Sequence, residues 1–258
     1  MNIKKRVAVF SAANLASALL AMLGSLWAAN VAGPSLMGTY NALQLIATYA
    51  PIMAIGIYNG LNRELPFSIG QGAVNEAREL AAVALYICRI TCIMASAAII
   101  AAAIMKRDEP VLYYGLLVYV LVVPLTLYRT YLEVTFRTSH DFMWLSTVKI
   151  ITAVVSVGLV LLMYIDSWFG ILARALAIAF CSTFLLWRRQ PFPVAPTWNR
   201  KLFFRLIKIG FPIFVVGYLY LLFISSDRLI IMTKLTIDDL GYYTPSLLIL
   251  QGMSILPT

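Results

Sequence analysis

Residues 80–105 read LAAVALYICRITCIMASAAIIAAAIM, and this run contains a single charged side chain, Arg89. A helix that crosses the hydrocarbon core of a bilayer needs about 20 mostly apolar residues, so the run is long enough to span it. Its apolar residues are consecutive rather than alternating, which argues against a strand of a membrane β-barrel. The run therefore predicts a transmembrane helix.

The same pattern recurs on both sides of this run. Apolar residues make up 62% of the 258-residue chain, charged residues make up 12%, and the mean hydropathy is +0.87. Soluble domains carry about 45–50% apolar and about 25% charged residues. We therefore expect an all-α integral membrane protein, a multi-helix bundle, rather than a soluble enzyme. The expected hydrophobic segments are 7–31, 38–62, 80–105, 111–136, 143–165, 168–187, 206–234 and 240–258.

Turn-forming residues separate these segments, among them Gly33-Pro34 and the group of Pro66, Gly70 and Gly72. With the N-terminus inside, fourteen Lys and Arg fall at inside ends and four at outside ends. This positive-inside bias predicts a cytoplasmic N-terminus. The net charge of +9 is then explained by loops that contact anionic membrane lipids, so no nucleic-acid partner is expected.

An internal repeat divides the chain. Leu36–Tyr40 aligns with Asp239–Tyr243 at an offset of 203, and each copy follows a long helix and a short outside loop. The stretch 188–205 contains three prolines and predicts a cytoplasmic linker that ends in a short interfacial amphipathic helix. We therefore expect an N-terminal six-helix transmembrane lobe at 1–187, the linker at 188–205, and the start of a C-terminal lobe at 206–258. The repeat being incomplete, we expect the chain to be part of a longer protein.

Several short motifs occur in a recognisable order. They are Gly33–Tyr40, Gly56–Pro66, Gly70–Gly72 with Asn75–Ala77, Gly210–Pro212, Ser226–Ile231 and Leu240–Tyr243. Together they resemble the Wzx-type polysaccharide-biosynthesis flippases of the MOP superfamily, which also holds the MATE-like exporters and the lipid II flippases. The resemblance implies a two-lobe MATE-like transporter, of which this chain is the first six-helix lobe and the first two helices of the second.

The resemblance also implies a function. Such a protein moves undecaprenyl-pyrophosphate-linked oligosaccharide, a precursor of O-antigen or exopolysaccharide, from the cytoplasmic to the outer leaflet by alternating access. It lies in a bacterial or archaeal plasma membrane. Its expected partners are the lipid-linked substrate, membrane lipids, a polysaccharide polymerase and other assembly proteins, with H⁺ or Na⁺ as coupling ions.

Polar residues in the first two segments are candidates for a hydrophilic cavity. Asn41, Gln44, Thr48 and Tyr58 lie close to one helical face, and Asn14 lies in the first segment. Polar groups avoid lipid because transfer into hydrocarbon is costly. The alternative is interhelical hydrogen bonding, worth about 0.6 kcal/mol each.

Charged residues inside the segments form a second group of candidates. Arg89 is too deep to reach the interface easily, so it faces either the substrate or a structural partner. Arg174 is close enough to a helix end that we expect its side chain to extend outward to the interface. Four further residues are gate or ion-pair candidates, namely Arg129, Glu133, Asp227 and Arg228. For Arg129 and Glu133 we favour a salt bridge at the membrane rim.

No motif for catalysis, cofactor binding or metal binding is evident. Cys88 and Cys92 share a helical face, but His140 is the single histidine, and buried thiols behave mostly as small apolar residues. We therefore expect neither an enzyme nor a bound cofactor or metal. A MATE-like drug or cation antiporter would need buried acidic residues in its cavity helices, and the first two segments contain no Asp or Glu. A membrane-embedded polymerase or glycosyltransferase would need large outside loops or a nucleotide-sugar motif, and the sequence shows neither.

Overall fold

The computed structural model describes residues 3–139 and 141–253, and no β-strand occurs among them. As predicted, the protein is an integral membrane bundle of α-helices. The elements are α1 (Ile3–Tyr49), η1 (Ala50–Ala54), α2 (Ile57–Gly70), α3 (Val74–Met105), α4 (Pro110–Thr138), α5 (Phe142–Gly158), η2 (Leu159–Tyr164), α6 (Ser167–Arg188), α7 (Arg200–Lys234), α8 (Ile237–Tyr242) and α9 (Thr244–Met253).

Six spans among the described residues are long and apolar enough to cross a membrane. Eight segments were expected, and the difference has two causes. Segments one and two are continuous in α1, and the α9 residues described are fewer than a span requires. The spans are Asn14–Ala54, Val74–Met105, Pro110–Thr138, Phe142–Tyr164, Ser167–Arg188 and Arg200–Lys234.

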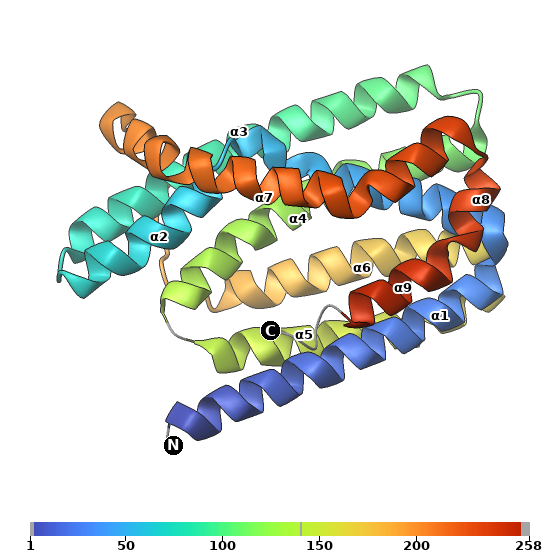
Figure 1. Ribbon diagram of the computed structural model, residues 1–258. Coiled ribbons are helices and arrows are strands. Elements are labelled where there is room, and N and C mark those ends of the chain that lie inside the picture. The colour runs from blue at the N-terminus through green and yellow to red at the C-terminus, as the bar shows by residue number, and fades with distance from the viewer. Residues whose placement is uncertain (1–2, 140, 254–258) are drawn as a thin grey trace.

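The element α1 is two antiparallel helices joined at one residue. Its 47 residues would measure about 70 Å as a straight helix, against about 30 Å of hydrocarbon. Gly33 has φ 76° and ψ 172°, a conformation open to glycine, and Pro34 follows it. Figure 1 shows the blue chain turning back at this point. The short loop expected after Gly33 is therefore a single non-helical residue. We call residues 3–32 the first crossing and residues 34–70 the second crossing.

The second crossing is interrupted near its middle. The α-helix ends at Tyr49, the 3₁₀ turn η1 follows with Pro51 at its start, and Ile55 (φ 45°) and Gly56 (φ 84°) are both left-handed. The helix then resumes as α2. Pro66 was expected to mark a turn, but it lies inside α2, whose C-cap is Gln71. Membrane helices tolerate such a proline because neighbouring groups satisfy the freed carbonyl.

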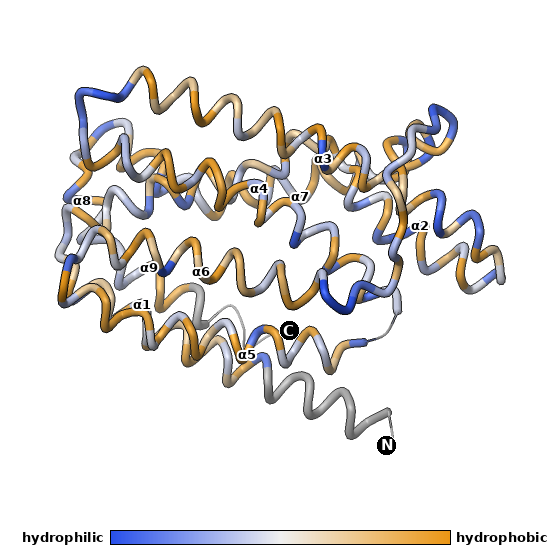
Figure 2. The backbone as a smooth tube through the Cα atoms, turned by 180° about the vertical axis from the view of Figure 1, so that it is seen from behind, coloured by the Kyte–Doolittle hydropathy of each residue, from blue (hydrophilic) through white to orange (hydrophobic). Residues whose placement is uncertain are grey.

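The ends of the crossings alternate as the segment order predicts. In Figure 1 the start of α1, the α2–α3 turn, the end of α4, the start of α5 and the α6–α7 linker lie at one end of the bundle. The Gly33 turn, the α3–α4 turn and α8 lie at the opposite end. Figure 2 shows many of the hydrophilic residues near the two ends, as expected for a bundle that crosses a bilayer. We call these ends the N-terminal end and the opposite end.

The helix pairs that build the bundle are α3 with α4, α4 with α6, and α1 with α5. One buried cluster at the N-terminal end joins α2, α3 and α4 around Leu61, Leu80 and Phe136. A second cluster joins the second crossing, α3, α4 and α6 around Leu43, Tyr119 and Leu172. After the linker, α7 packs against α2, and α8 and α9 pack against α1.

The linker does not end in a separate short helix. Residues 190–198 have no helix, and α7 then runs without a break from Arg200 to Lys234. Asn199 caps it, because its side chain accepts hydrogen bonds from the backbone N–H groups of Lys201 (3.0 Å) and Leu202 (3.3 Å). The basic, aromatic stretch after Asn199 is therefore the first turns of a long membrane helix.

Candidate functional site

The interruption of the second crossing is stabilised by α7. A broken helix leaves carbonyl groups without partners, which is costly away from water. The hydroxyl of Tyr218 donates a hydrogen bond to the carbonyl of Tyr49 (2.8 Å). The hydroxyl of Tyr49 is in turn hydrogen-bonded to the Ser225 hydroxyl. Two α7 side chains, two turns apart, therefore hold the end of α1.

Glycines bring the two helices into backbone contact just beyond the break. A Cβ added to Gly210 of α7 would collide with the carbonyl of Gly56 and the backbone nitrogen of Gly60. A Cβ added to Gly60 would collide with the carbonyl of Leu206. Close approach of this kind is how membrane helices associate without a hydrophobic driving force. It fixes α7 against α2 beside the break.

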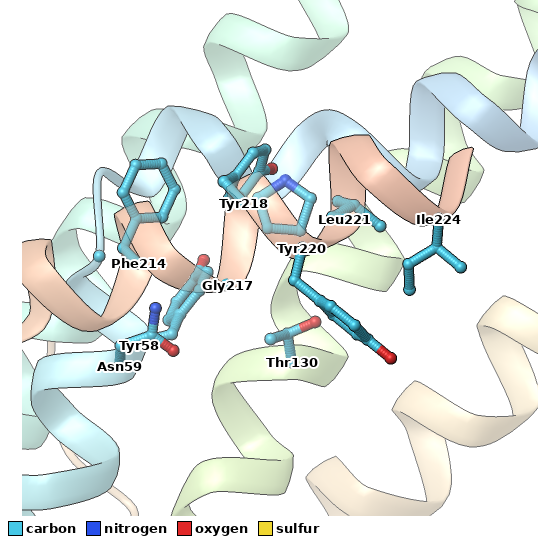
Figure 3. A pocket seen from close by; sticks show the side chains of 11 residues that line it. Tyr58, Asn59, Thr130, Phe214, Gly217, Tyr218, Tyr220, Leu221 and Ile224 are labelled. Atoms are coloured by element: carbon cyan, nitrogen blue, oxygen red, sulfur yellow. The ribbon is translucent and has the colours of Figure 1, made fainter. Parts of the chain in front are cut away.

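A cavity of about 410 Å³ lies where the break, α2, α4 and α7 meet. Figure 3 shows side chains of all four elements around it. Its polar side chains are Tyr58, Asn59, Thr130, Tyr218 and Tyr220. Among the described residues, no Asp, Glu, Lys or Arg lines it. The full lining is Pro51, Gly56, Tyr58, Asn59, Thr130, Phe214, Gly217, Tyr218, Tyr220, Leu221 and Ile224.

Tyr58 is the one predicted cavity residue that lines this space. Its side chain is 6% exposed, and it lies beside Cys88 and Thr91 of α3. It therefore joins the cavity wall to the buried cluster between α2 and α3. The three cysteines are free thiols, and within the described residues no three His, Cys, Asp or Glu side chains form a metal-binding group. His140 lies outside the described residues.

An ion-pair cluster closes the N-terminal end of the same interface. Arg205 of α7 contacts Glu64 of α2, with Nε to Oε2 at 2.5 Å, and also pairs with Glu76 of α3. The Glu64 side chain is only 9% exposed, whereas Arg205 and Glu76 are about one-third exposed. A nearly buried carboxylate needs a cation close by. We call these three residues the Arg205 cluster.

A second contact, between α8 and α1, lies at the opposite end. A Cβ on Gly38 of α1 would collide with the carbonyl of Ile237, and a Cβ on Gly241 of α8 would collide with that of Pro34. Gly38 and Gly241 are repeat partners at the offset of 203, and so are Pro34 and Ile237. The contact is therefore reciprocal, as at a two-fold interface.

The predicted polar stripe mostly makes structural hydrogen bonds. Asn41 donates to the hydroxyl of its repeat partner Thr244 (2.7 Å). Gln44 donates to the hydroxyl of Tyr40 (2.6 Å), and Thr48 donates to the backbone carbonyl of Gln44 (2.8 Å). None of Asn41, Gln44 and Thr48 lines the cavity beside α7.

Asn14 connects two helices of the first part of the chain. Its side-chain oxygen accepts a hydrogen bond from the ammonium group of Lys149 on α5 (3.1 Å). This contact belongs to the α1–α5 pair and lies away from α7. Asn14 does not line the cavity.

Arg89 is exposed on α3 near Tyr128 of α4 and does not line the cavity. At about 100° per residue, it points roughly 200° away from Thr91, which faces Tyr58. The structure therefore does not bring Arg89 to the cavity.

The ion pair of Arg129 with Glu133 is present at 3.5 Å. The same carboxylate of Glu133 also pairs with Arg137 at 3.5 Å. The pair expected at the rim is therefore a chain of three charges along α4. All three side chains are between about one-quarter and about one-half exposed, so each pair contributes little on its own.

Asp227 and Arg228 lie near the α8–α9 corner. A carboxylate oxygen of Asp227 accepts a hydrogen bond from the hydroxyl of Tyr243, and the other accepts one from the backbone N–H of Arg228 (2.7 Å). The Nε of Arg228 is buried and makes no hydrogen bond with the described residues. Asp227 therefore joins α7 to the repeat motif at 240–243.

The expectation for Arg174 was wrong. Its side chain does not extend outward to the interface but is 5% exposed inside the bundle. Its Nε donates to the carbonyl (3.0 Å) and the hydroxyl (2.9 Å) of Ser156, and one terminal nitrogen donates to the hydroxyl of Ser25 (3.0 Å). Two helices, α1 and α5, place oxygen acceptors around this α6 side chain, so the buried guanidinium need not reach water.

Sequence reasoning missed Asn59 of α2, Thr130 of α4 and the residues that α7 contributes. Tyr218 and Tyr220 lie in an apolar segment where aromatic residues are ordinary, and Arg205 lies in a basic stretch that the linker explains equally well. Gly210 and Gly217 on one helix were the available signal, since small residues mark close helix contacts in membranes. That signal does not identify the partner helix.

The fold and the site define a multi-pass membrane protein with a neutral, aromatic-lined cavity beside a broken helix. Residues 80–254 match the family model described as "Polysaccharide biosynthesis protein". This match covers more than half of the chain, so the chain belongs to the polysaccharide biosynthesis protein family. No curated protein and no solved structure matches it significantly.

Proposed function

We propose that the protein is a flippase that carries undecaprenyl-pyrophosphate-linked oligosaccharide from the cytoplasmic to the outer leaflet by alternating access. The observation that supports this most is the cavity beside α7. It offers aromatic rings, an amide and hydroxyl groups, and none of the described residues that line it is Asp, Glu, Lys, Arg or His. Such a lining suits sugars, and the family takes part in polysaccharide biosynthesis.

The two contacts of the chain after the linker suit alternating access. The Arg205 cluster joins α7 to α2 and α3 at the N-terminal end. The Gly38–Gly241 contact joins α8 to α1 at the opposite end. In the proposed cycle the Arg205 cluster is a gate that breaks when the N-terminal, cytoplasmic end opens. The reciprocal contact acts as the pivot about which the two parts rotate.

The membrane potential supplies part of the driving force. Moving one charge through 100 mV is worth about 2.3 kcal/mol, so a dianionic pyrophosphate moving outward gains about twice that when the cell interior is negative. Proton or sodium antiport would add to this. No covalent bond changes in this role, so the proposed protein is a transporter rather than an enzyme. It would deliver its substrate to a polysaccharide polymerase and other assembly proteins.

Two other transport functions share parts of this chemistry. A lipid II flippase also moves a pyrophosphate-linked sugar, and the cavity suits it equally. A MATE-like drug antiporter takes cations, for which a carboxylate in the cavity is expected. The absence of any acidic residue among those that line the described cavity favours a sugar over a cation.

Transport is tested in cells that lack the native protein. We expect lipid-linked repeat units to accumulate on the cytoplasmic leaflet, and the native gene to restore their export to the surface. The units are counted by their accessibility to an added lectin in spheroplasts and after lysis. Equal surface accessibility with and without the protein would contradict the proposed function.

A further inference from the structure

We propose that the cavity beside α7 is a binding subsite for one neutral sugar ring, with Tyr220 as its stacking face and Asn59 and Thr130 as its hydrogen-bonding groups. The inference rests on the proposed function only in taking a glycan as the cargo. It adds which part of the cargo this cavity holds and which side chains hold it.

The ring of Tyr220 is the one large exposed aromatic surface of the cavity. Tyr220 is 68% exposed, and its hydroxyl makes no hydrogen bond with the described residues. The hydroxyl of Tyr218, by contrast, is already committed to the carbonyl of Tyr49. Figure 3 shows the Tyr220 ring on the same side of the α7 ribbon as Asn59 and Thr130. The ring is therefore free to contact a ligand.

The polar groups that line the cavity with Tyr220 are also available. The side chain of Asn59 is partly buried and makes no hydrogen bond with any described residue. Its amide therefore has two N–H donors and one oxygen acceptor to offer. The hydroxyl of Thr130 donates to the carbonyl of Thr126 (2.9 Å), so its oxygen is left as an acceptor.

A sugar ring matches this arrangement on both of its chemical sides. Its C–H groups carry slight positive charge and pack against the negative face of an aromatic ring. Its hydroxyl groups both donate and accept, as an amide and a hydroxyl require. The cavity volume of about 410 Å³ falls within the range of about 300–1,000 Å³ typical of small-ligand sites.

The other parts of a lipid-linked glycan fit this cavity poorly. A pyrophosphate needs cations, and no Lys or Arg is found in the part of the cavity wall that the structure describes. An isoprenoid chain would bury the amide of Asn59 without a hydrogen-bond partner, which is unfavourable. The diphosphate and the lipid tail of the cargo therefore lie outside this cavity while the sugar occupies it.

The test uses the native protein in lipid nanodiscs and saturation-transfer difference NMR. The probes are glucose, galactose and N-acetylglucosamine, with tetraphenylphosphonium, inorganic pyrophosphate and farnesol as the ionic and lipid comparisons. We expect at least one neutral sugar to receive saturation at its ring protons. Tyr220→Ala and Asn59→Ala should each weaken that binding at least tenfold, while Tyr220→Phe should keep it because the stacking face remains.

Phe223→Ala is the matched control. Phe223 lies on the same helix, is 82% exposed and does not line the cavity, so its variant should bind sugar normally. Each variant is first shown to elute from size-exclusion chromatography as the native protein does. The proposal is overturned if no neutral sugar binds, if binding survives both Tyr220→Ala and Asn59→Ala, or if Phe223→Ala loses it equally. It is also overturned if one of the comparison probes displaces the sugar.

The two proposals fail separately. A protein that binds sugar through Tyr220 but leaves lipid-linked units on the cytoplasmic leaflet keeps the subsite and loses the flippase function. A protein that exports the units but binds none of the sugars, with export unchanged in Tyr220→Ala, keeps the function and loses the subsite.

Discussion

The contact of α7 with α2 and the contact of α8 with α1 both rest on glycine, yet different groups complete them. At α2–α7 the Arg205 cluster adds ion pairs to the crossing of Gly56 and Gly210. At α1–α8 the crossing of Gly38 and Gly241 is completed by neutral groups, the amide of Asn41 and the hydroxyl of Thr244.

The two contacts also differ in symmetry. The α1–α8 contact joins residues that are equivalent in the repeat, so each side presents the same surface to the other. The α2–α7 contact joins residues at unrelated positions of the repeat. A reciprocal neutral contact can pivot with little change in its partners. An ion-paired contact is either formed or fully broken, because partly separated charges in a poorly solvated place are costly. This difference makes the Arg205 cluster the better gate and the α1–α8 crossing the better pivot.

Among the changes at the two contacts, Gly210→Val should lower the stability of the protein most. The new side chain would overlap the backbone of α2 at Gly56 and Gly60, which cannot move aside as a flexible side chain would. Overpacking costs about 1–3 kcal/mol, and we expect the upper end here. The measurement is the apparent melting temperature of the detergent-solubilised protein. Gly217→Val is the control, because nothing lies within 4 Å of a Cβ at Gly217. Equal melting temperatures for the two variants would contradict the close crossing.

Arg205→Ala should have the second largest effect. It leaves Glu64, whose side chain is 9% exposed, without its cation. The expected loss of stability is about 2 kcal/mol, between the values for exposed and buried ion pairs. Thermal unfolding measures it, and protease sensitivity should rise at the α2–α7 contact but not at α1–α8.

Lys106→Ala provides the comparison for Arg205→Ala. The Lys106–Glu109 pair is about half exposed on both sides, so its loss should cost less than 1 kcal/mol. Exchanging the charges, with Arg205→Glu and Glu64→Arg combined, should recover part of the stability lost by either change alone. No recovery would argue that the pair contributes nothing to the contact.

Asn41→Ala and Thr244→Ala together measure the neutral contact. The two residues share one hydrogen bond of 2.7 Å, so a double-mutant cycle should give a coupling of about 0.6 kcal/mol, the average for membrane helices. Thr233→Ala replaces Thr244→Ala in the control cycle, because the Thr233 hydroxyl bonds only to carbonyls of its own helix. A coupling as large with Thr233 as with Thr244 would contradict the contact.

The smallest effect should be the loss of the α8 cap when the pH is lowered. The carboxylate of Asp239 accepts hydrogen bonds from the backbone N–H and the hydroxyl of Thr236, and these lower its pKa below the usual 3.8. A lowered pKa contributes stability that is present above about pH 3.8 and is lost as the pH falls through the folded-state value. Asp239→Asn should remove this pH dependence from hydrogen exchange of the α8 amides. Unchanged pH dependence in that variant would assign it to another group.

The sequence predicted the crossings and their alternation well. A crossing requires about 20 mostly apolar residues, whatever the helix packs against. Composition over that length is therefore enough to predict it. The repeat at Gly38 and Gly241 was also visible, and it marked a true contact. The break at 50–56 was not expected, although Pro51 and Gly56 lie there, because both residues also occur within unbroken membrane helices.

The amino-acid order by itself determined that this is a polytopic membrane protein and which two stretches are copies of each other. It also placed most helix ends to within about two turns. These properties follow from local composition and from comparison of the chain with itself. Only the tertiary structure decided that Arg174 is buried against Ser25 and Ser156, that Arg205 pairs with Glu64, and that Asn59 and Tyr220 border one cavity. In a membrane every helix is apolar on most sides, so hydropathy does not indicate which face meets which neighbour.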